Sequence, residues 1–380
     1  DDTETSICQF GLSTKHLNQV GPAIQKHAWT YTAGDWKGQI HYAVIGPNLA
    51  PATRYYYRVG DTHSDLWSDT FDFTTPALLT PNWISRLYIY GDMGTFMPMG
   101  FEVTDAMKKY NAKVPQKVPL DYLVHAGDIS YASTGEPKEM EWIWDLWADQ
   151  VEPLAAHWPY MVTVGNHEKF YNFTAFRNRF RTPDINGGLG NFFYSYDHLG
   201  IHWVSMSTER YENLYSVGSK QYEWMEKDLA KAIANRKNVP WIVVVGHRPP
   251  YSSDKATDSG PLRVDLEPLW KKYKVDLVVA GHMHCYERTF PVYNNLVNMS
   301  GVEKDLQTYR NPSEPVYLVI GTAGALIDEK WVEPQPAWSA NRFQHYGFGE
   351  ITANQTVLHF KFIQWDKIDE AKDEMVLIKI

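Results

Sequence analysis

Runs of consecutive apolar residues recur along the chain after residue 84, and most of them end in a glycine. They are too short for helices and carry few polar positions, which is the pattern of strands buried on both faces. The runs are RLYIYGD, LDYLVHAGD, YMVTVGNH, IHWVSMS, WIVVVGH, DLVVAGH and VYLVIGTAG. Stretches with helical spacing of apolar residues separate several of them, for example SKQYEWMEKDLAKAIANR. Buried strands that alternate with amphipathic helices predict a layered α/β domain around an internal sheet.

The first part of the chain has a different pattern. Its apolar and aromatic residues form short runs divided by Gly, Pro, Asn or Asp, which is typical of small antiparallel sandwiches. The runs are HAWTYT, QIHYAVIG, TRYYYRVG and SDTFDFTT. A proline-bearing stretch, TTPALLTPNW, follows them and reads as a linker. We therefore expect a β-sandwich over residues 1–76, a linker over 77–83 and the α/β domain over 84–380.

Composition narrows the class of protein. A length of 380 residues suits two domains, and a net charge of −9 without any basic run argues against a nucleic-acid partner. No apolar stretch approaches the roughly 18 residues that a membrane-spanning helix needs. The two cysteines, Cys8 and Cys285, predict no disulfide framework and leave a single link open. Sequons at Asn172, Asn298 and Asn354 favour a secreted glycoprotein, although such triplets often arise by chance.

Five of the expected strands end in a glycine followed at once by a side chain that can bind a metal. The pairs are Gly91-Asp92, Gly127-Asp128, Gly165-Asn166, Gly246-His247 and Gly281-His282. Ligands of open α/β sheets bind outside the carboxyl ends of the strands, so these donors are expected to share one space. Each pair alone is common in turns and helix caps. All five together, with His284 two residues after His282, indicate a metal-binding cleft.

Five motifs closely resemble those of the purple acid phosphatases, a family of binuclear metallophosphoesterases. They are GDMG (91–94), GDISYA (127–132), GNHE (165–168), GHRPPY (246–251) and GHMHCYER (281–288). The tyrosine of GDISYA is the most specific element, because it separates these enzymes from other calcineurin-like phosphoesterases. The resemblance covers essentially the whole chain, since larger members carry an N-terminal fibronectin-like sandwich. It implies a layered α/β/β/α catalytic domain, preceded here by a sandwich that we expect to be partial.

The resemblance also implies two metal sites that share one carboxylate. A ferric ion would be held by Asp92, Asp128, Tyr131 and His284. A divalent ion (Zn²⁺, Mn²⁺ or Fe²⁺) would be held by the bridging Asp128 with Asn166, His247 and His282. Carboxylates and a phenolate suit a trivalent ion, whereas imidazoles and an amide oxygen suit borderline divalent ions. Paired ions of this kind can bind phosphoryl oxygens and activate water, so we expect hydrolysis of phosphate monoesters at acidic pH by a metal-activated hydroxide.

The source of the leaving-group proton is less clear from the sequence. His167 matches the family's histidine that hydrogen-bonds the substrate phosphate and can assist protonation of the leaving group; an orienting role is its alternative. Plant-type members carry further histidines after the GHRP segment, but the corresponding stretch here, YSSDKATDSGP (251–261), has none. Glu168 receives no role. His125 and His202 lie in apolar runs and are expected to be structural, and a substrate-side role for His345 is the less favoured reading.

Two other functions remain open at this point. One is a nucleotide phosphodiesterase or pyrophosphatase of the same fold, since the same metals can activate water against diesters. The other is a catalytically weak binding module that uses the sandwich. The expected partners are small phosphate esters, with no nucleic acid and no membrane span; a homodimer is one option for the oligomeric state. The expected location is secreted, extracellular or in a lysosome or vacuole.

Overall fold

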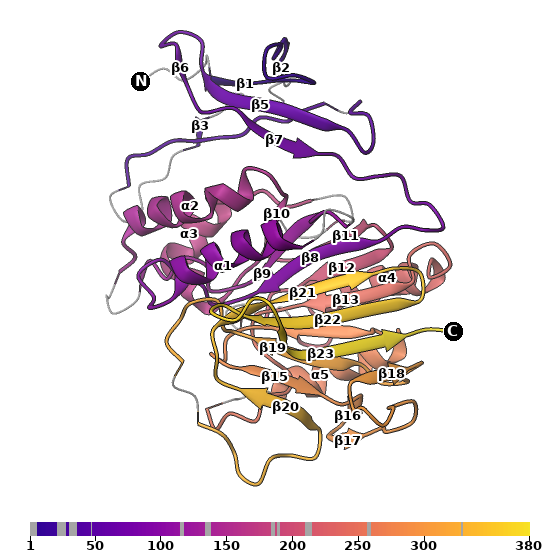
Figure 1. Cartoon of the computed structure of the whole chain (residues 1–380). Helices are drawn as coiled ribbons and strands as arrows, with labels where there is room; N and C mark the ends of the chain where they lie inside the picture. The colour runs from indigo at the N-terminus through magenta and orange to yellow at the C-terminus, as the bar shows by residue number, and fades with distance from the viewer. Residues whose placement is uncertain are drawn as a thin grey trace.

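The computed structural model describes most of the chain. The described residues are 6–20, 28–29, 36–46, 48–114, 118–133, 138–183, 187, 191–209, 215–256, 260–327 and 330–380. They form an N-terminal antiparallel sheet that lies above a larger body of two sheets and flanking helices (Figure 1).

The N-terminal sheet has five strands, ordered β2-β1-β5-β6 with β7 also paired to β5. These strands are β1 (Ser6–Gly11), β2 (Gln19–Val20), β5 (Arg54–Asp61), β6 (Leu66–Trp67) and β7 (Phe71–Thr74). A separate ribbon joins β3 (Ala28–Trp29) to β4 (Ile40–His41). The strand expected over QIHYAVIG is therefore only two residues long. Just beyond it, the Tyr42 hydroxyl donates to the Asn178 carbonyl in the larger body.

In the larger body, the described residues form two sheets of seven strands each. The first, in the order β10-β9-β8-β21-β22-β23-β18, consists of β8 (Ser85–Tyr90), β9 (Tyr122–Ala126), β10 (Tyr160–Thr163), β18 (Thr308–Arg310), β21 (Gly347–Ala353), β22 (Val357–Gln364) and β23 (Ala371–Ile378). The second, in the order β11-β12-β13-β14-β19-β15-β20, consists of β11 (Tyr194–His198), β12 (Ile201–Ser205), β13 (Trp241–Val245), β14 (Leu277–Ala280), β15 (Tyr286–Thr289), β19 (Val316–Ile320) and β20 (Ser339–Phe343). A small ribbon pairs β16 (Val292–Tyr293) with β17 (Leu296–Val297).

Helices cover the outer faces of both sheets. They are α1 (Gly100–Lys113), α2 (Glu141–Ala155), α3 (Phe170–Arg179), α4 (Lys220–Ala234) and α5 (Gly260–Lys272). Side chains alternate along β8: Tyr88 and Tyr90 pack against α1, α2 and α3, while Leu87 and Ile89 enter the core between the sheets. On the second sheet, Val244 packs against α4 and α5. These layers confirm the expected α/β/β/α architecture.

All seven apolar runs form strands, namely β8, β9, β10, β12, β13, β14 and β19. The antiparallel strands β21, β22 and β23 have no counterpart in the sequence analysis. Along much of β22 and β23, side chains alternate between buried and partly exposed positions, so these two strands lack a continuous apolar run. Both cysteines, Cys8 and Cys285, are buried and free, which rules out the disulfide that the sequence left open.

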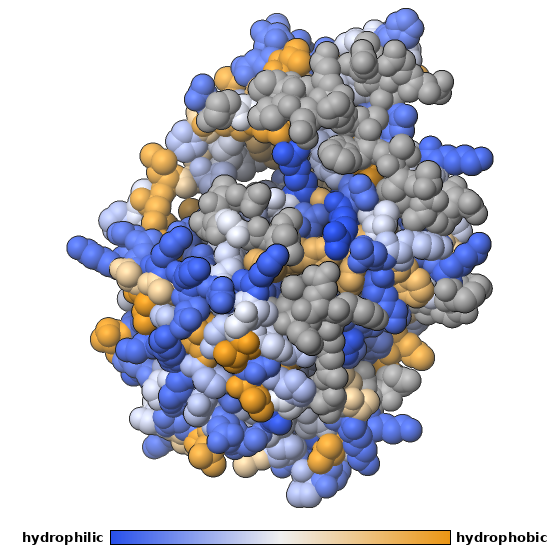
Figure 2. Space-filling view, turned by 180° about the vertical axis from the view of Figure 1, so that it is seen from behind, coloured by the Kyte–Doolittle hydropathy of each residue, from blue (hydrophilic) through white to orange (hydrophobic). Residues whose placement is uncertain are grey.

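The N-terminal sheet lies on the side of α2 in Figure 1 and contacts the residues just after this helix. The Tyr57 hydroxyl donates to the Ala156 carbonyl over 2.7 Å. His157 lies 2.9 Å from the Asp72 carbonyl oxygen and 3.3 Å from its carboxylate. No described helix is long and apolar enough to cross a membrane. On the face shown in Figure 2, hydrophilic side chains cover much of the described surface and hydrophobic ones are scattered among them.

A buried histidine ties the second sheet to the helix that covers it. His202 on β12 lies 2.6 Å from the Asp197 carboxylate and 2.9 Å from that of Asp228 on α4, and Ser195 donates to Asp228. Burial lowers the pKa of His202, but hydrogen bonds to Asp197 and Asp228 outweigh burial and raise it to about 9. The structural role expected for His202 is thereby confirmed.

This raised pKa predicts a pH-dependent contribution to stability. The folded-state value of about 9 exceeds the unfolded value of ~6.5. The contribution is therefore complete below pH ~6.5 and disappears as the pH rises toward 9. The free energy of unfolding, measured with denaturant at pH 6 and pH 9, should fall between these pH values by up to about 3 kcal/mol more in wild type than in His202→Gln. His63→Gln, at an exposed histidine, should behave as wild type. An equal pH dependence in wild type and His202→Gln would contradict the prediction.

Candidate metal centre

The loops that leave five strands of the larger body converge on one place. Strands β8, β9 and β10 are parallel neighbours in the first sheet, and β13 and β14 are parallel neighbours in the second. Each of these loops places at least one polar side chain, directly after the strand's glycine or a few residues later, in a common cluster. The converging side chains are those of Asp92, Asp128, Tyr131, Asn166, His247, His282 and His284.

The backbone at this edge adopts conformations that side chains normally disfavour. Four of the converging residues have left-handed φ angles: Asp92 at 60°, Asp128 at 50°, Tyr131 at 54° and His282 at 70°. Such residues cost ~1–3 kcal/mol each and persist only when surrounding contacts hold them. Glycine is required beside them. A Cβ at Gly127 (φ +79°) would lie 2.5 Å from the ring of His247, and one at Gly281 would lie 2.2 Å from the Asp92 carboxylate.

One group of contacts centres on the Tyr131 hydroxyl. This oxygen lies 2.9 Å from Nε2 of His284, 3.2 Å from Oδ1 of Asp92 and 3.4 Å from Oδ2 of Asp128. Asp92 is fully buried and Asp128 nearly so. The backbone N–H of His282 donates to Oδ2 of Asp92, which fixes the carboxylate. Two carboxylates, a phenol and an imidazole thus meet at one point.

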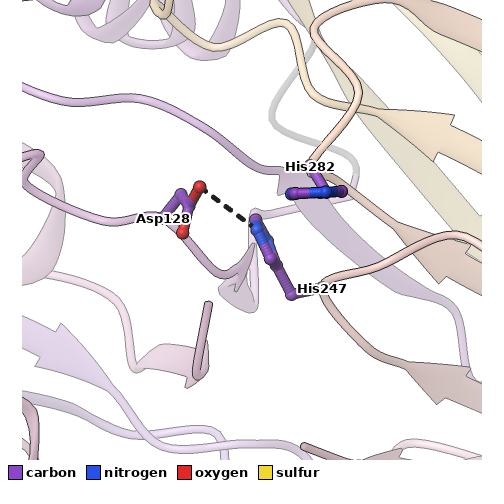
Figure 3. A group of neighbouring side chains, drawn as sticks. All are labelled: Asp128, His247 and His282. Atoms are coloured by element: carbon purple, nitrogen blue, oxygen red, sulfur yellow. Dashed lines mark ion pairs between the residues drawn. The ribbon is translucent and has the colours of Figure 1, made fainter. Parts of the chain in front are cut away.

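A second group shares Asp128 with the first. Nε2 of His247 lies 3.1 Å from Oδ2 of Asp128 and 3.1 Å from Oδ1 of Asn166. One donor atom from each of Asp128, His247 and His282 lies within 4.8 Å of the other two. Figure 3 shows Asp128 and His247 pointing toward each other, with His282 beside them. Asp128 therefore stands between the two groups.

Hydrogen bonds behind the imidazoles indicate what the two groups can hold. Nδ1 of His247 lies 2.9 Å from the Ala126 carbonyl, and Nδ1 of His284 lies 2.8 Å from the Leu326 carbonyl. A carbonyl only accepts, so each Nδ1 carries a proton, and a ring that carries no second proton presents its Nε2 lone pair to the centre. The lone pair of His247 then faces the oxygens of Asp128 and Asn166. Converging acceptors without protons between them fit a bound cation.

The electrostatics of the centre also call for positive charge. Burial lowers the pKa of His247, but the Asp128 carboxylate outweighs burial and raises it to about 10. Burial likewise lowers the pKa of His284, but the Asp92 carboxylate raises it to about 9. Burial would raise the pKa of Asp128, yet the neighbouring His247 and His167 hold it below its ordinary value. The carboxylates thus stabilise positive charge on the histidines, and metal ions can supply that charge instead of protons.

His167 lies on the solvent side of this centre. Its side chain is 31% exposed, whereas that of Asp128 is 2% exposed. Its ring lies 4.3 Å from the Tyr131 ring, and its backbone N–H donates to Oδ1 of Asp128 over 2.8 Å. His167 is therefore held beside the converging donors with its ring open to a ligand.

Glu168, to which the sequence gave no role, fastens two of the loops together. Its carboxylate accepts hydrogen bonds from the backbone N–H groups of Gly165 (2.7 Å), Ile129 (2.8 Å) and Asp128 (3.0 Å). Burial and the Asp128 charge raise the pKa of Glu168 to about 8, while the Ile129 and Gly165 donors lower it. Its position three residues after Gly165, at the end of a 3-10 turn (Asn166–Glu168), was the only signal for this role in the sequence.

Other candidates are not among the converging donors. His125 is buried with Nδ1 2.9 Å from the Tyr160 hydroxyl, and burial lowers its pKa to about 3, consistent with the expected structural role. Tyr251 is buried and donates to Glu267, so it packs in the core. The segment 251–261 is described except for residues 257–259. His345 is exposed and lines a surface pocket with Trp365.

Comparison with protein families and known structures gives consistent matches along the chain. Residues 59–286 match the calcineurin-like phosphoesterase family, residues 1–75 match the purple acid phosphatase N-terminal domain, and residues 314–374 match the iron/zinc purple acid phosphatase-like protein C domain. The chain is 34% identical to acid phosphatase type 7 of Mus musculus, covering 87% of this chain and 75% of that protein.

Two further relatives extend this comparison. The chain is 32% identical to the Fe(3+)-Zn(2+) purple acid phosphatase 12 of Arabidopsis thaliana, covering 86% of this chain and 68% of that protein. The structure of a purple acid phosphatase from yellow lupin (Lupinus luteus) seeds superposes with a TM-score of 0.84 at 24% identity, covering 100% of this chain and 70% of that one. This last similarity concerns the fold.

The contacts of Glu168 predict a test of how the centre is held. Glu168→Ala leaves three buried N–H groups without their acceptor, so the loops of Asp128 and Asn166 should separate. Loss of such a supporting group typically lowers metal affinity ~10–100-fold. Metal content measured by elemental analysis after dialysis should fall, while far-UV circular dichroism stays unchanged. Glu223→Ala, at an exposed position of α4, is the control. Full retention of metal by Glu168→Ala would show that Glu168 does not support the site.

Proposed function

The chain belongs to the purple acid phosphatases, and we propose that its seven converging donors are the ligands of the family's two metal ions. The protein is a metal-dependent acid phosphatase that hydrolyses phosphate monoesters, and its cofactors are iron and a divalent metal. The comparisons favour this activity over that of a nucleotide phosphodiesterase or pyrophosphatase. The observation that carries the proposal is the meeting of acceptor atoms around Asp128, with imidazole lone pairs facing carboxylate oxygens.

The contacts support a division of the ligands into two sets. We propose that the ferric ion is held by Asp92, Asp128, Tyr131 and His284, and the divalent ion by Asp128, Asn166, His247 and His282. The first set gathers the carboxylates and the phenol around the Tyr131 hydroxyl. Anionic oxygens suit a trivalent ion, and the imidazole-rich second set suits a borderline divalent one. Because Asp128 touches both groups, it is the natural bridge.

The surrounding residues prepare the site for an anionic ester. When bound, the two ions supply Lewis acidity to phosphoryl oxygens and lower the pKa of water. The backbone contacts of Glu168 hold Asp128 in place, and the Ala126 and Leu326 carbonyls orient His247 and His284. These contacts fix the donors before substrate arrives, so little reorganisation is needed during the reaction.

His167 is the group we propose to donate the leaving-group proton. Its ring is partly exposed beside the centre and its main chain is anchored to Asp128. The segment after GHRP offers no histidine, and Asp254 within it is buried and accepts hydrogen bonds from the Ala256 and Lys330 backbones. An imidazole in this position can hydrogen-bond a phosphate oxygen and pass a proton to the leaving group.

The remaining expectations stay proposals. We infer a sandwich domain over 1–76, a linker over 77–83 and a catalytic domain over 84–380. A secreted, lysosomal or vacuolar location is supported by the sequons, of which Asn172 has an exposed side chain. Sensitivity of the native protein to an endoglycosidase would test that location, and sedimentation would test a homodimer.

The proposed function is tested most directly by elemental analysis of the purified protein together with its visible spectrum. Iron and a divalent metal in equal amounts, with a broad visible band, are the expected result. Hydrolysis of p-nitrophenyl phosphate should then depend on both metals. A protein that binds no metal, or gains no hydrolysis when loaded with two, would favour the weak binding module instead.

Replacement of Tyr131 tests the iron ligand set. A phenolate bound to ferric iron absorbs visible light by charge transfer, so Tyr131→Phe should remove the band while the protein stays folded. The variant should stay folded because the change removes only one hydroxyl, and the hydrogen-bond partners of that hydroxyl all belong to the metal centre. Tyr293→Phe, outside the centre, should keep the wild-type spectrum. An unchanged band in Tyr131→Phe would remove this tyrosine from the proposed ligands.

Replacement of the two histidines of the GHMH motif tests the division between sites. His282→Ala should deplete the divalent metal at least 10-fold more than iron, because it removes one of that ion's proposed ligands. His284→Ala should do the reverse and weaken the visible band. Elemental analysis of both variants side by side provides the measurement. Equal loss of both metals in each variant would count against the proposed division.

A further inference from the structure

Arg248 places a guanidinium at the edge of the proposed divalent site. It follows His247 directly, and its side chain is 29% exposed. Nη1 lies 2.8 Å from Nε2 of His282. Arg248 is thus a cationic side chain within hydrogen-bond distance of a proposed metal ligand, and it is reachable from solvent.

A buried carboxylate orients this guanidinium. Glu209 is 3% exposed, and its two oxygens each lie 3.2 Å from the arginine, one from Nε and the other from Nη2. This two-point contact fixes the plane of the guanidinium and leaves Nη1 directed toward the centre. The negative charge lies behind the arginine and the positive charge faces the site.

A purely structural role does not account for the guanidinium. The loops of residues 207–209 and 246–248 are already joined by the Arg248 backbone N–H, which donates to the Thr208 hydroxyl over 2.8 Å. The loop contact therefore needs only the backbone of this residue. The arrangement instead suits anion binding: the buried Glu209 holds the guanidinium in place, and the partly exposed Arg248 can bind an anion.

The contact with His282 is compatible with release of Nη1 to a ligand. A guanidinium has only donors, so Nε2 of His282 is the acceptor of this hydrogen bond. An ion bound at Nε2 would use the same lone pair. An ion bound at Nδ1 would leave the proton of the neutral ring on Nε2, which then cannot accept. In either case Nη1 is left free to donate elsewhere.

Building on the proposed function, we infer that Arg248 binds a non-bridging oxygen of the substrate phosphate and makes the enzyme prefer monoesters over diesters. Paired cations in such sites bind phosphoryl oxygens. A monoester dianion has a further charged oxygen for a guanidinium to bind, whereas the corresponding oxygen of a diester carries an alkyl group. The oriented Arg248–Glu209 pair therefore stabilises the dianionic substrate selectively.

The test compares Arg248→Gln with wild type on two substrates that share one leaving group, p-nitrophenyl phosphate and methyl p-nitrophenyl phosphate. The kcat/KM for the monoester should fall roughly 10- to 100-fold, as expected for loss of a charged hydrogen bond, while that for the diester changes less than about 3-fold. Calorimetry should show a similar weakening for inorganic phosphate and little change for dimethyl phosphate. Arg248→Lys should recover part of the phosphate affinity. Arg310→Gln, which breaks an exposed pair with Glu303, is the control.

The outcomes separate this inference from the function on which it rests. Equal effects on both esters, no effect on either, or loss of metal from Arg248→Gln and Arg248→Lys would overturn the role of Arg248 and leave the phosphatase assignment intact. A wild-type protein without metal would instead refute the proposed centre, and the inference with it.

Discussion

The structure depends on a cluster of buried acceptors that cannot be stable without positive charge among them. Asp92 and Asp128 are almost fully removed from solvent, and hydrogen bonds to backbone carbonyls turn the Nε2 atoms of His247 and His284 toward them. Burying such groups unpaired would cost several kcal/mol each. Left-handed backbone at four of the ligand positions adds to that cost. Buried charge and strained backbone are thus concentrated at one edge of the sheets, as is expected at a cation-binding site, where function outweighs stability.

The two proposed metal sites draw on both sheets. Asp92, Asp128, Tyr131 and Asn166 follow strands of the first sheet, and the three histidines follow strands of the second. The relative position of the donors therefore depends on the core between the sheets, where Leu87 and Ile89 pack with Val243 and Val279. Because close-packed interiors resist deformation, this core can hold the donors at a fixed separation. A buried ion pair stiffens the same region: Arg288, four residues after the GHMH motif, donates two hydrogen bonds to the Asp373 carboxylate.

The sequence predicts those parts whose signals are local. Continuous apolar runs identify seven strands because those strands are buried on both faces, and five of the seven proposed ligands directly follow a glycine. Strands β22 and β23 escape notice because alternating exposure gives no continuous run, whereas β21 is buried but contains two glycines and a glutamate. Glu168 and Glu209 escape notice for another reason: an isolated glutamate acquires its role from partners that only the fold brings near, such as Ile129 for one and Arg248 for the other. Partners distant in sequence leave no local pattern.

The proposed proton donor and the proposed charge-selecting group lie on different sides of the same centre. His167 is anchored to Asp128 and its ring contacts that of Tyr131, on the side of the proposed ferric ion. Arg248 contacts His282, on the side of the proposed divalent ion. A phosphate ester that bridges the two sites would therefore meet an imidazole at one end and a guanidinium at the other. Because a guanidinium stays charged at every accessible pH whereas an imidazole does not, substrate charge can be recognised independently of the protonation of the leaving group. This separation offers a physical reason why the segment after GHRP needs no histidine: in the proposed arrangement His167 holds the proton while Arg248 supplies the additional positive charge.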